Sequence, residues 1–169
     1  MINNILKAWN VGLVRRWHTQ PELCDTVDYD SGHQQRCTIL LLLFWPDSTR
    51  DAIIDVITHD QGEDDAGDMA RPAKKNNPTI RELLESVELA SIREQGFNFH
   101  NITELEFHRR KFVDLLDSYV WMLRNKSQMT RKVEWMVQLE SLYTQAKALK
   151  VSYVFDQYIQ SAISFYDPH

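Results

Sequence analysis

The chain has 169 residues, of which 43% are apolar and 25% are charged, and its net charge is −5. At roughly 150 residues per domain, this length predicts one domain over residues 1–169. The negative charge argues against a protein that holds nucleic acid by neutralising its phosphates. Two cysteines are too few for a disulfide framework, which favours a cytoplasmic protein. The longest apolar run, residues 39–45, is too short to cross a bilayer, so we expect no membrane partner.

Apolar residues near the N-terminus recur at helical spacing. They predict an amphipathic helix over residues 2–17 that packs one apolar stripe inward. The stripe consists of Ile5, Trp9, Leu13 and Trp17. Residues 18–31 are polar, contain Pro21 and have no apolar period, so they predict a long loop.

A nearly continuous apolar segment follows this loop. It predicts a helix over residues 31–44, buried on several sides and ended by Pro46. His33 would lie in the first turn of this helix, next to the polar loop.

A shorter helix is expected next, because Asp47 or Ser48 can cap its N-terminus. Its expected apolar face consists of Ile53, Ile54 and Ile57. This face leads to His59 and Asp60 at the C-terminal end of the helix. Residues 61–77 are rich in charge and turn-forming residues, and they predict a second polar loop.

The rest of the chain predicts further helices. Pro78 suits the first position of a helix over residues 78–95, and Gly96 suits its C-terminal cap. Thr103 would begin a long helix that ends near Lys126. Two more helices are expected over residues 130–149 and 151–164. Glycine and proline number only 5 each and sustained two-residue alternation is absent, so the sequence predicts an all-α fold, a single compact helical bundle.

Two histidines, His33 and His59, border the polar loops and have acidic neighbours. His59 is followed directly by Asp60, and at a helix end both side chains can converge on one ion. Neutral imidazole and carboxylate are good ligands for Zn, Mn, Fe or Co, and further ligands would come from other helices. The alternative is an ordinary charged helix C-terminus that interacts with the helix dipole.

The sequence around this pair has a specific spacing. Residues 59–72, HDQGEDDAGDMARP, resemble the signature of HD-domain phosphohydrolases, in particular the branch that contains bacterial deoxynucleoside monophosphatases. The family pattern H-D-x-x-E-x-x-x-G-D, followed by proline and lysine, is met here by His59, Asp60, Glu63, Gly67, Asp68, Pro72 and Lys74. Arg16-Trp17 and residues 110–119, RKFVDLLDSY, resemble two further blocks of the same branch, so the similarity extends over residues 15–123.

This resemblance implies a divalent metal ion, which would be Zn, Co or Mn, with Mg as a candidate second ion. The ligands that it implies are His33, His59, Asp60 and Asp114. Helical periodicity leaves Asp117 open as the competing fourth ligand, with a solvated or capping acid as its other interpretation. One position departs from the family, which often has an acid directly before the first histidine, where this chain has Gly32.

The resemblance also implies catalytic acids. Glu63 would orient or deprotonate a water molecule, or protonate the leaving oxygen, and Asp68 would assist it. The alternative for this acidic run is a solvated loop, which we retain for Asp64 and Asp65.

A phosphorylated substrate also needs cations and a surface for its base. Arg16 and Lys74 are the first candidates for phosphate contacts, and Arg71 and Lys75 are further ones. Additional cations occur at residues 109–111, whereas His100 and His108 match no motif and are expected to be surface or packing residues. Trp17 and His18 could form a wall for the base, although Trp17 could equally belong to the core.

Residues 15–21, RRWHTQP, together with the short chain, resemble the phage branch of this family, which includes dATP triphosphohydrolases. This similarity implies a deoxynucleotide substrate, release of deoxyadenosine and triphosphate, and a location in the host cytoplasm. The alternatives are hydrolysis of deoxynucleoside monophosphates and a catalytically silent all-α interaction protein. Relatives of this kind form homo-oligomers, so a dimer or hexamer is expected.

Overall fold

The computed structural model describes residues 2–63, 67, 77–96 and 102–167. Over these residues the backbone forms α-helices, one 3-10 helix and a single isolated bridge, with no named strand. The predicted all-α class is therefore confirmed. No helix within these ranges is both long and apolar enough to span a lipid bilayer.

The chain divides into two compact units, and each is described by itself. The first unit comprises residues 1–35 and 57–100, and the second comprises residues 36–56 and 101–169. One boundary falls within α2 (Asp30–Phe44), whose first turn belongs to the first unit, and another falls before the last residue of α3 (Arg50–Ile57).

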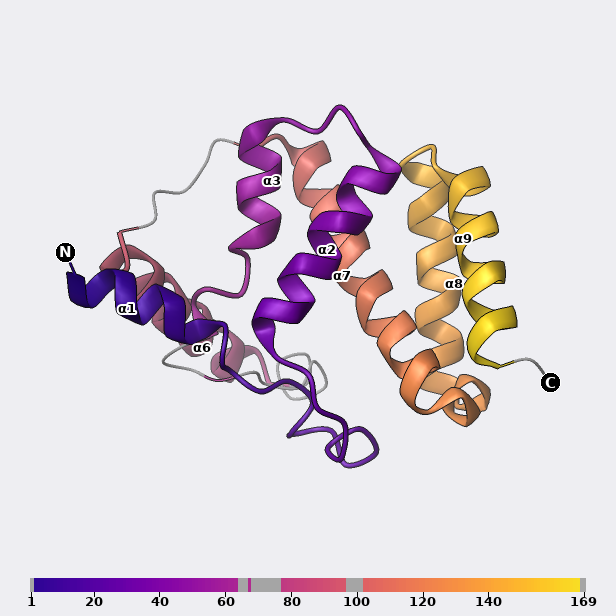
Figure 1. Cartoon of the computed structure of the whole chain (residues 1–169), viewed down its shortest axis with the longest axis horizontal. Coiled ribbons are helices and arrows are strands. Elements are labelled where there is room, and N and C mark those ends of the chain that lie inside the picture. The colour runs from indigo at the N-terminus through magenta and orange to yellow at the C-terminus, as the bar shows by residue number, and fades with distance from the viewer. Residues whose placement is uncertain (1, 64–66, 68–76, 97–101, 168–169) are drawn as a thin grey trace. The chain divides into compact units, whose positions relative to one another are not determined.

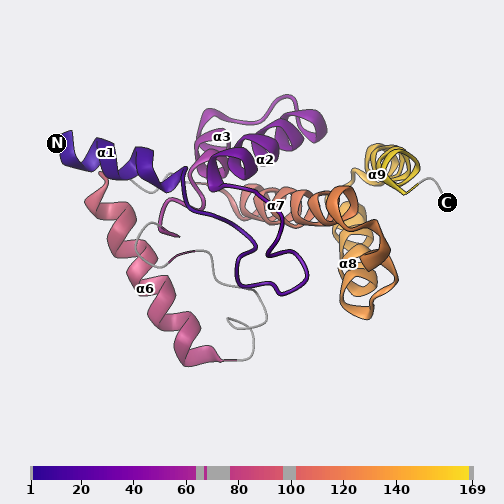
Figure 2. The same cartoon turned by 60° about the horizontal axis from the view of Figure 1, so that its bottom comes forward.

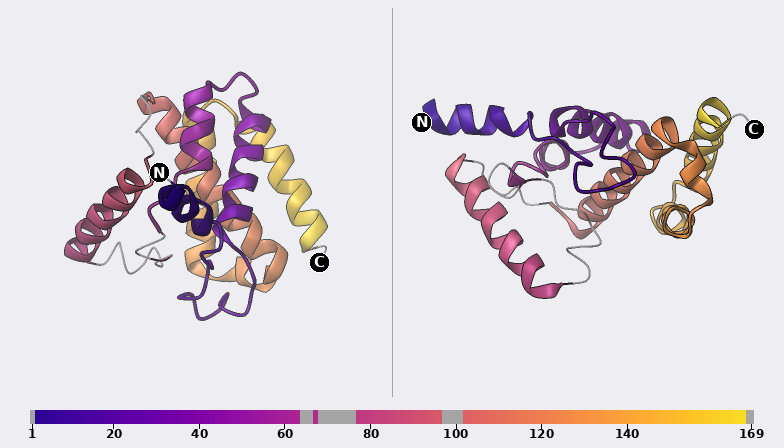
Figure 3. Two further views of the ribbon diagram at one scale, coloured as in Figure 1. Left: turned by 60° about the vertical axis from the view of Figure 1, so that its left-hand side comes forward. Right: turned by 90° about the horizontal axis from the view of Figure 1, so that it is seen from below.

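The first unit contains α1 (Ile2–Val11) and α6 (Pro78–Glu94). The Asn77 side chain caps α6 by accepting a hydrogen bond from Ile80 N at 3.2 Å, and Gly96 follows the helix with φ +85°, as the sequence predicts. The C-terminal end of α6 lies next to α1 (Figures 2 and 3), where Lys7 Nζ is 2.7 Å from Glu94 Oε2.

Helix α1 is shorter than predicted, and the expectation of an inward apolar stripe is wrong. The helix ends at Val11, and Trp9 and Leu13 are 68% and 60% exposed. Trp17 is buried, but it lies outside the helix. The physical reason is a long-range pairing: Arg16 N donates to Asp28 O at 3.0 Å, and this backbone bridge competes with helix continuation.

Helix α2 (Asp30–Phe44) agrees with the predicted element, but one of its faces is open. The side chains of Leu40, Leu41 and Phe44 are buried, whereas those of Ile39 and Leu43 are more than half exposed. The expectation that this helix is buried on several sides is therefore wrong. An apolar run shows which residues can be buried, not how many neighbouring elements exist to cover them.

Helix α3 (Arg50–Ile57) ends before His59, so the histidine and its neighbouring aspartate lie in the turn beyond the helix. Thr49 caps α3, because its Oγ1 accepts a hydrogen bond from Ala52 N at 3.1 Å. The buried residues of the helix are Ala52 and Val56, whereas Ile53 and Ile54 are half-buried and Ile57 is 44% exposed, so the predicted apolar face is not the buried one.

The second unit is built around a long central helix, α7 (Glu104–Asn125). A 3-10 helix, η1 (Ser127–Arg131), leads into α8 (Val133–Ala148) and then α9 (Ser152–Tyr166), and both of these α-helices pack on α7 (Figure 1). Aromatic rings fill the centre of this unit: the Phe112 ring lies edge-on to the rings of Phe44 and Phe155 at centroid distances of 5.4 and 5.6 Å. Full burial of such a side chain contributes about 1.5–3 kcal/mol.

Candidate metal centre

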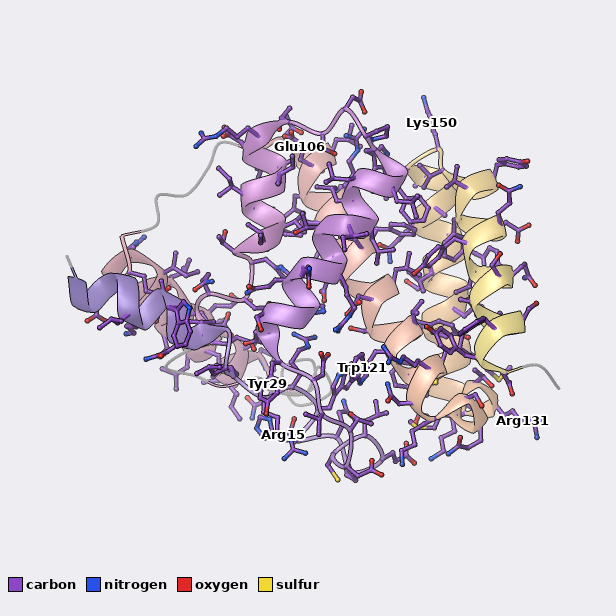
Figure 4. The ribbon with its side chains drawn as sticks, in the orientation of Figure 1. Arg15, Tyr29, Glu106, Trp121, Arg131 and Lys150 are labelled. Carbon is purple, nitrogen blue, oxygen red and sulfur yellow. The ribbon has the colours of Figure 1, made fainter. Side chains whose placement is uncertain are left out.

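The first predicted ligand, His33, lies in the first turn of α2 and is completely buried. Its backbone N donates to Tyr29 O at 3.1 Å, which ties the start of α2 to the preceding loop. The same loop is held by Arg15, whose guanidinium donates to the carbonyl oxygens of Cys24 and Thr26 at 2.8 and 3.3 Å. Arg15 and Tyr29 also form the isolated bridge, and they are neighbours in Figure 4.

The second and third predicted ligands come from the turn after α3. This turn is closed by two backbone hydrogen bonds, from Gln61 N to Thr58 O at 3.1 Å and from Glu63 N to Asp60 O at 2.9 Å. The side chains of His59 and Asp60 are only 3% and 16% exposed. The turn therefore presents an imidazole and a carboxylate from adjacent positions inside the first unit.

The three side chains converge on one point. The Nε2 atoms of His33 and His59 are 3.3 Å apart. One carboxylate oxygen of Asp60 is 3.5 Å from His33 Nε2, and the other is 3.4 Å from His59 Nε2. Sequence reasoning predicted this convergence from residues 26 positions apart along the chain.

This donor set fits a divalent cation. Two nitrogens bound at ~2.0–2.1 Å to a tetrahedral ion are separated by about 3.3 Å. The observed separation of the two imidazole nitrogens, 3.3 Å, equals that value. The ring planes are inclined by 57°, so the contact is not a parallel stack. Imidazole nitrogen with carboxylate oxygen is a ligand combination suited to Zn, Co or Mn.

A group of buried acids adds negative charge at the same place. One carboxylate oxygen from each of Asp30, Asp60 and Glu63 lies within 4.8 Å of the others. Asp30 is fully buried and Glu63 is 7% exposed. Like charges this close in a poorly solvated site are costly unless a cation compensates them. The ligand atoms of the histidine pair and of this acidic group lie close enough together for each group to hold a metal ion.

Arg16 is placed within this cluster. Its Nη1 atom is 2.9 Å from Asp60 Oδ2 and 3.4 Å from Asp30 Oδ1, and its Nε atom is 3.8 Å from Asp28 Oδ2. The Arg16 side chain is 9% exposed. The structure thus pairs the guanidinium with carboxylates, one of which is a predicted metal ligand, and its contact with a phosphate stays a prediction.

Sequence reasoning missed Asp28 and Asp30. The resemblance directs attention to the residue directly before His33, which is Gly32. In the structure the acid that precedes His33 most closely in the chain is Asp30, in the same first turn of α2, and its carboxylate lies 3.4 Å from Arg16 Nη1. The Asp-Tyr-Asp sequence next to a helix start was the available signal, because its two aspartates fall on the same side of an extended segment.

The sequence left two interpretations of Trp17 open, a wall for the base or a core residue, and the structure supports the core residue. Trp17 is 8% exposed, and its Nε1 donates to Asp28 Oδ2 at 3.4 Å. Its φ of +68° is rare for a bulky residue and costs about 1–3 kcal/mol, which the surrounding loop must offset. His18, in contrast, is exposed, with Nδ1 2.8 Å from Arg15 O.

The fourth predicted ligand, Asp114, lies on α7 in the second unit, and its meeting with the other three stays a prediction. Its competitor, Asp117, is buried and receives two hydrogen bonds from Arg36, at 2.7 Å from Nε and 3.0 Å from Nη2. Interpreting Asp117 as a solvated or capping acid is therefore wrong. Both oxygens of Asp117 thus accept from one guanidinium, and Asp117 stays the alternative fourth ligand.

Glu63 is the one predicted catalytic acid within the described residues. The other predicted site residues lie outside those residues, namely Asp68, Arg71, Lys74 and Lys75. Comparison with protein-family models, curated proteins and solved structures finds no match to this chain. The geometry of the first unit is therefore the main support for a functional proposal.

Proposed function

We propose that this protein is a metal-dependent phosphohydrolase of deoxynucleotides that converts dATP and water into deoxyadenosine and triphosphate. One observation carries the proposal: His33, His59 and Asp60 converge within 3.5 Å of one another, and Glu63 lies in the same buried turn. The resemblance of residues 59–72 to the HD-domain signature supplies the reaction class.

In this proposal the two imidazoles and the Asp60 carboxylate would hold a divalent ion, and Asp114, the fourth ligand that the resemblance implies, stays a prediction. The ion, when bound, would polarise a phosphoryl oxygen and make a water molecule more acidic. The protein's part is to hold the two imidazoles close together, with their Nε2 atoms 3.3 Å apart. Arg16, at 2.9 Å from Asp60, orients the carboxylate that lies between the two rings.

Glu63 would act as the proton acceptor. A water oxygen forms a bond to the α-phosphorus while the bond from that phosphorus to the 5′ oxygen breaks. Glu63 takes a proton from the water and can return it to the 5′ oxygen, which leaves as the hydroxyl of deoxyadenosine. The position of Glu63 supports this role, because it is 7% exposed and lies in the same turn as His59 and Asp60.

The phosphate chain needs positive charge that the acidic cluster does not supply. Arg71, Lys74 and Lys75 follow Glu63 in the sequence and would contact the β and γ phosphates. The preference for deoxyadenosine rests on the resemblance of residues 15–21 to the phage branch. Trp17, Arg16 and the exposed His18 belong to this segment.

The proposal is tested by product analysis. Purified protein is incubated with Mn²⁺ or Co²⁺ and, separately, with each dNTP and each dNMP, and phosphate, pyrophosphate and triphosphate are resolved. We expect triphosphate from dATP. Phosphate from dNMPs alone would identify a 5′-deoxynucleotidase instead, and a protein without hydrolysis of any deoxynucleotide would overturn the proposal.

Two variants and a matched control connect the activity to the site. Asp60→Ala should abolish hydrolysis, and Glu63→Gln should lower kcat by ~10²-fold or more while the metal stays bound. His108→Ala is the control, because His108 is exposed on α7 and is paired only loosely with Glu104, at 3.7 Å. Its activity should equal that of the wild type.

A further inference from the structure

The turn that carries Glu63 is in close contact with helix α6, and Gly62 is the point of contact. A Cβ atom at position 62 would lie 2.5 Å from Glu88 Cβ, 2.7 Å from Glu88 Cα and 2.8 Å from Glu88 O. Two of these atoms are backbone, so rotation of a side chain cannot relieve the overlap. Only glycine allows the turn to approach α6 this closely.

The residue before this glycine is anchored to the same helix. Gln95 Nε2 donates to Gln61 O at 2.8 Å, and the same amide lies 3.2 Å from Ser91 Oγ. Gln61, Ser91 and Gln95 are all buried. A buried carbonyl that loses its donor is left without a hydrogen bond, so this contact strongly favours one position of the turn.

These two contacts fix the backbone on the N-terminal side of Glu63. Gln61 is held by its carbonyl oxygen and Gly62 by close packing, and Glu63 N donates to Asp60 O. A general base must lie about 2.6–3.2 Å from the proton that it removes. A displacement of about 1 Å can cost ~10²-fold in rate.

We propose that Gln95 and Gly62 are positioning residues that hold the Glu63 carboxylate in its catalytic place, so that α6 supports proton transfer without touching the substrate. This inference rests on the proposed hydrolytic function. We expect the effect to fall on Glu63 rather than on the proposed metal ligands, because the anchored carbonyl of Gln61 comes after His59 and Asp60 in the chain and His33 lies on α2.

The test replaces Gln95 by methionine, which keeps the volume and removes the donor. Gln138→Met is the matched control, because Gln138 Nε2 also donates to a backbone carbonyl, that of Leu115 at 3.2 Å, in the second unit. We expect Gln95→Met to lower kcat about 10-fold, with KM and Co²⁺ affinity within about twofold of the wild type. The Gln138 variant should keep the wild-type kcat.

A double variant separates positioning from general stability. If Gln95 acts through Glu63, the variant carrying both Gln95→Met and Glu63→Gln should be no slower than Glu63→Gln alone. Rate losses that multiply would overturn the inference. Loss of Co²⁺ binding in Gln95→Met would overturn it as well, because the defect would then lie in the metal centre.

Hydrogen exchange gives a readout that does not depend on activity. In Gln95→Met the amides of residues 58–63 should exchange faster, whereas those of α7 should not change. Gly62→Ala should show the same pattern with a larger loss of kcat. Unchanged exchange in the turn would overturn the inference.

The two proposals fail in different ways. A wild-type protein that binds Co²⁺ but hydrolyses no deoxynucleotide contradicts the proposed function, and with it the catalytic role of the turn. An active wild-type enzyme with a fully active Gln95→Met variant contradicts only the positioning role.

Discussion

The Nε2 atoms of His33 and His59 face each other at 3.3 Å inside the first unit. Two imidazole nitrogens at this distance can share a proton or a cation, and the nearby Asp60 carboxylate favours positive charge between them. Burial removes the competing water, since both side chains are at most 3% exposed. A divalent ion satisfies both nitrogens and the carboxylate together, which a single proton cannot do.

Metal binding should therefore raise thermal stability. At a free Co²⁺ or Zn²⁺ concentration of about 100 times Kd, stabilisation by mass action is ~2.7 kcal/mol, which is several degrees in Tm for a chain of this size. His59→Ala should remove most of this increase, because one of the two nitrogen ligands is lost. The measurement is differential scanning fluorimetry with added metal and then with excess chelator. An equal metal-induced increase in Tm for His59→Ala and for the control His108→Ala would contradict the site.

Much of this site could be predicted from the sequence, because the His-Asp pair and Glu63 are neighbours in the chain. Residues that are neighbours in the chain stay close in space in any fold, so the spacing of His59, Asp60 and Glu63 already indicates that they lie near one another. The position of His33 could also be inferred, since a polar loop before a helix places a first-turn residue at the edge of that helix.

The rest of the site depends on contacts between distant residues. The bridge between Arg15 and Tyr29 ends α1 early and brings Asp28 and Asp30 to Arg16, and no local periodicity indicates that pairing. The four-residue stripe that includes Trp9 and Leu13 shows the same limit. The stripe correctly predicted a helix at its first residues. It could not show where that helix ends, because the end depends on hydrogen bonds to distant residues.

A half-buried tyrosine in the second unit, Tyr158, provides a test of its packing. Burial raises the pKa of Tyr158 to about 12, and the negative charge of Asp117 contributes in the same direction, whereas Arg36 opposes it. The unfolded value is about 10, so the stabilisation is complete below pH 10 and is lost as the pH rises towards 12. We expect the free energy of unfolding to fall across this range.

Two variants check the cause of this shift. Tyr158→Phe should reduce the decline in stability between pH 10 and 12, although Tyr119, whose pKa is also raised by burial, retains part of it. Asp117→Asn should lower the Tyr158 pKa, as measured by ultraviolet titration of the phenol. An unchanged titration curve in Asp117→Asn would show that the aspartate has no electrostatic effect on this tyrosine.

Glu106 links the N-terminal ends of two helices and makes the second unit sensitive to acid. One carboxylate oxygen accepts from Thr49 Oγ1 at 2.6 Å, and the other accepts from Thr103 N at 2.7 Å in a capping box (Figure 4). These hydrogen bonds lower the pKa of Glu106 below its ordinary value of 4.5, and the hydrogen bond from Thr49 has the largest effect. Since the folded pKa is depressed, the stabilisation is present above pH 4.5 and is lost as the pH falls through the folded value.

Glu106→Gln isolates this charge, because glutamine can still form the capping box. Between pH 4.5 and 3 the wild type should lose about 1 kcal/mol or less relative to the variant, a small value because solvent screens this surface site. The measurement is the urea midpoint at each pH. Glu134→Gln in the first turn of α8 serves as the control, and an equal pH dependence in the two variants would contradict the role of Glu106.

The turn between α8 and α9 contains a lysine in a conformation that favours glycine. Lys150, labelled in Figure 4, has φ +60°. Val151 N donates to Ala146 O at 2.9 Å and Lys150 N donates to Lys147 O at 3.2 Å, which is the Schellman pattern. Lys150→Gly should stabilise the protein by about 1 kcal/mol, because the left-handed conformation costs a side-chain-bearing residue ~1–2 kcal/mol. Lys147→Gly, three residues earlier within α8, should destabilise it by a similar amount. Urea midpoints measure the change in stability of both variants. If the two glycine variants change stability in the same direction, backbone conformation does not determine which residue is preferred at position 150.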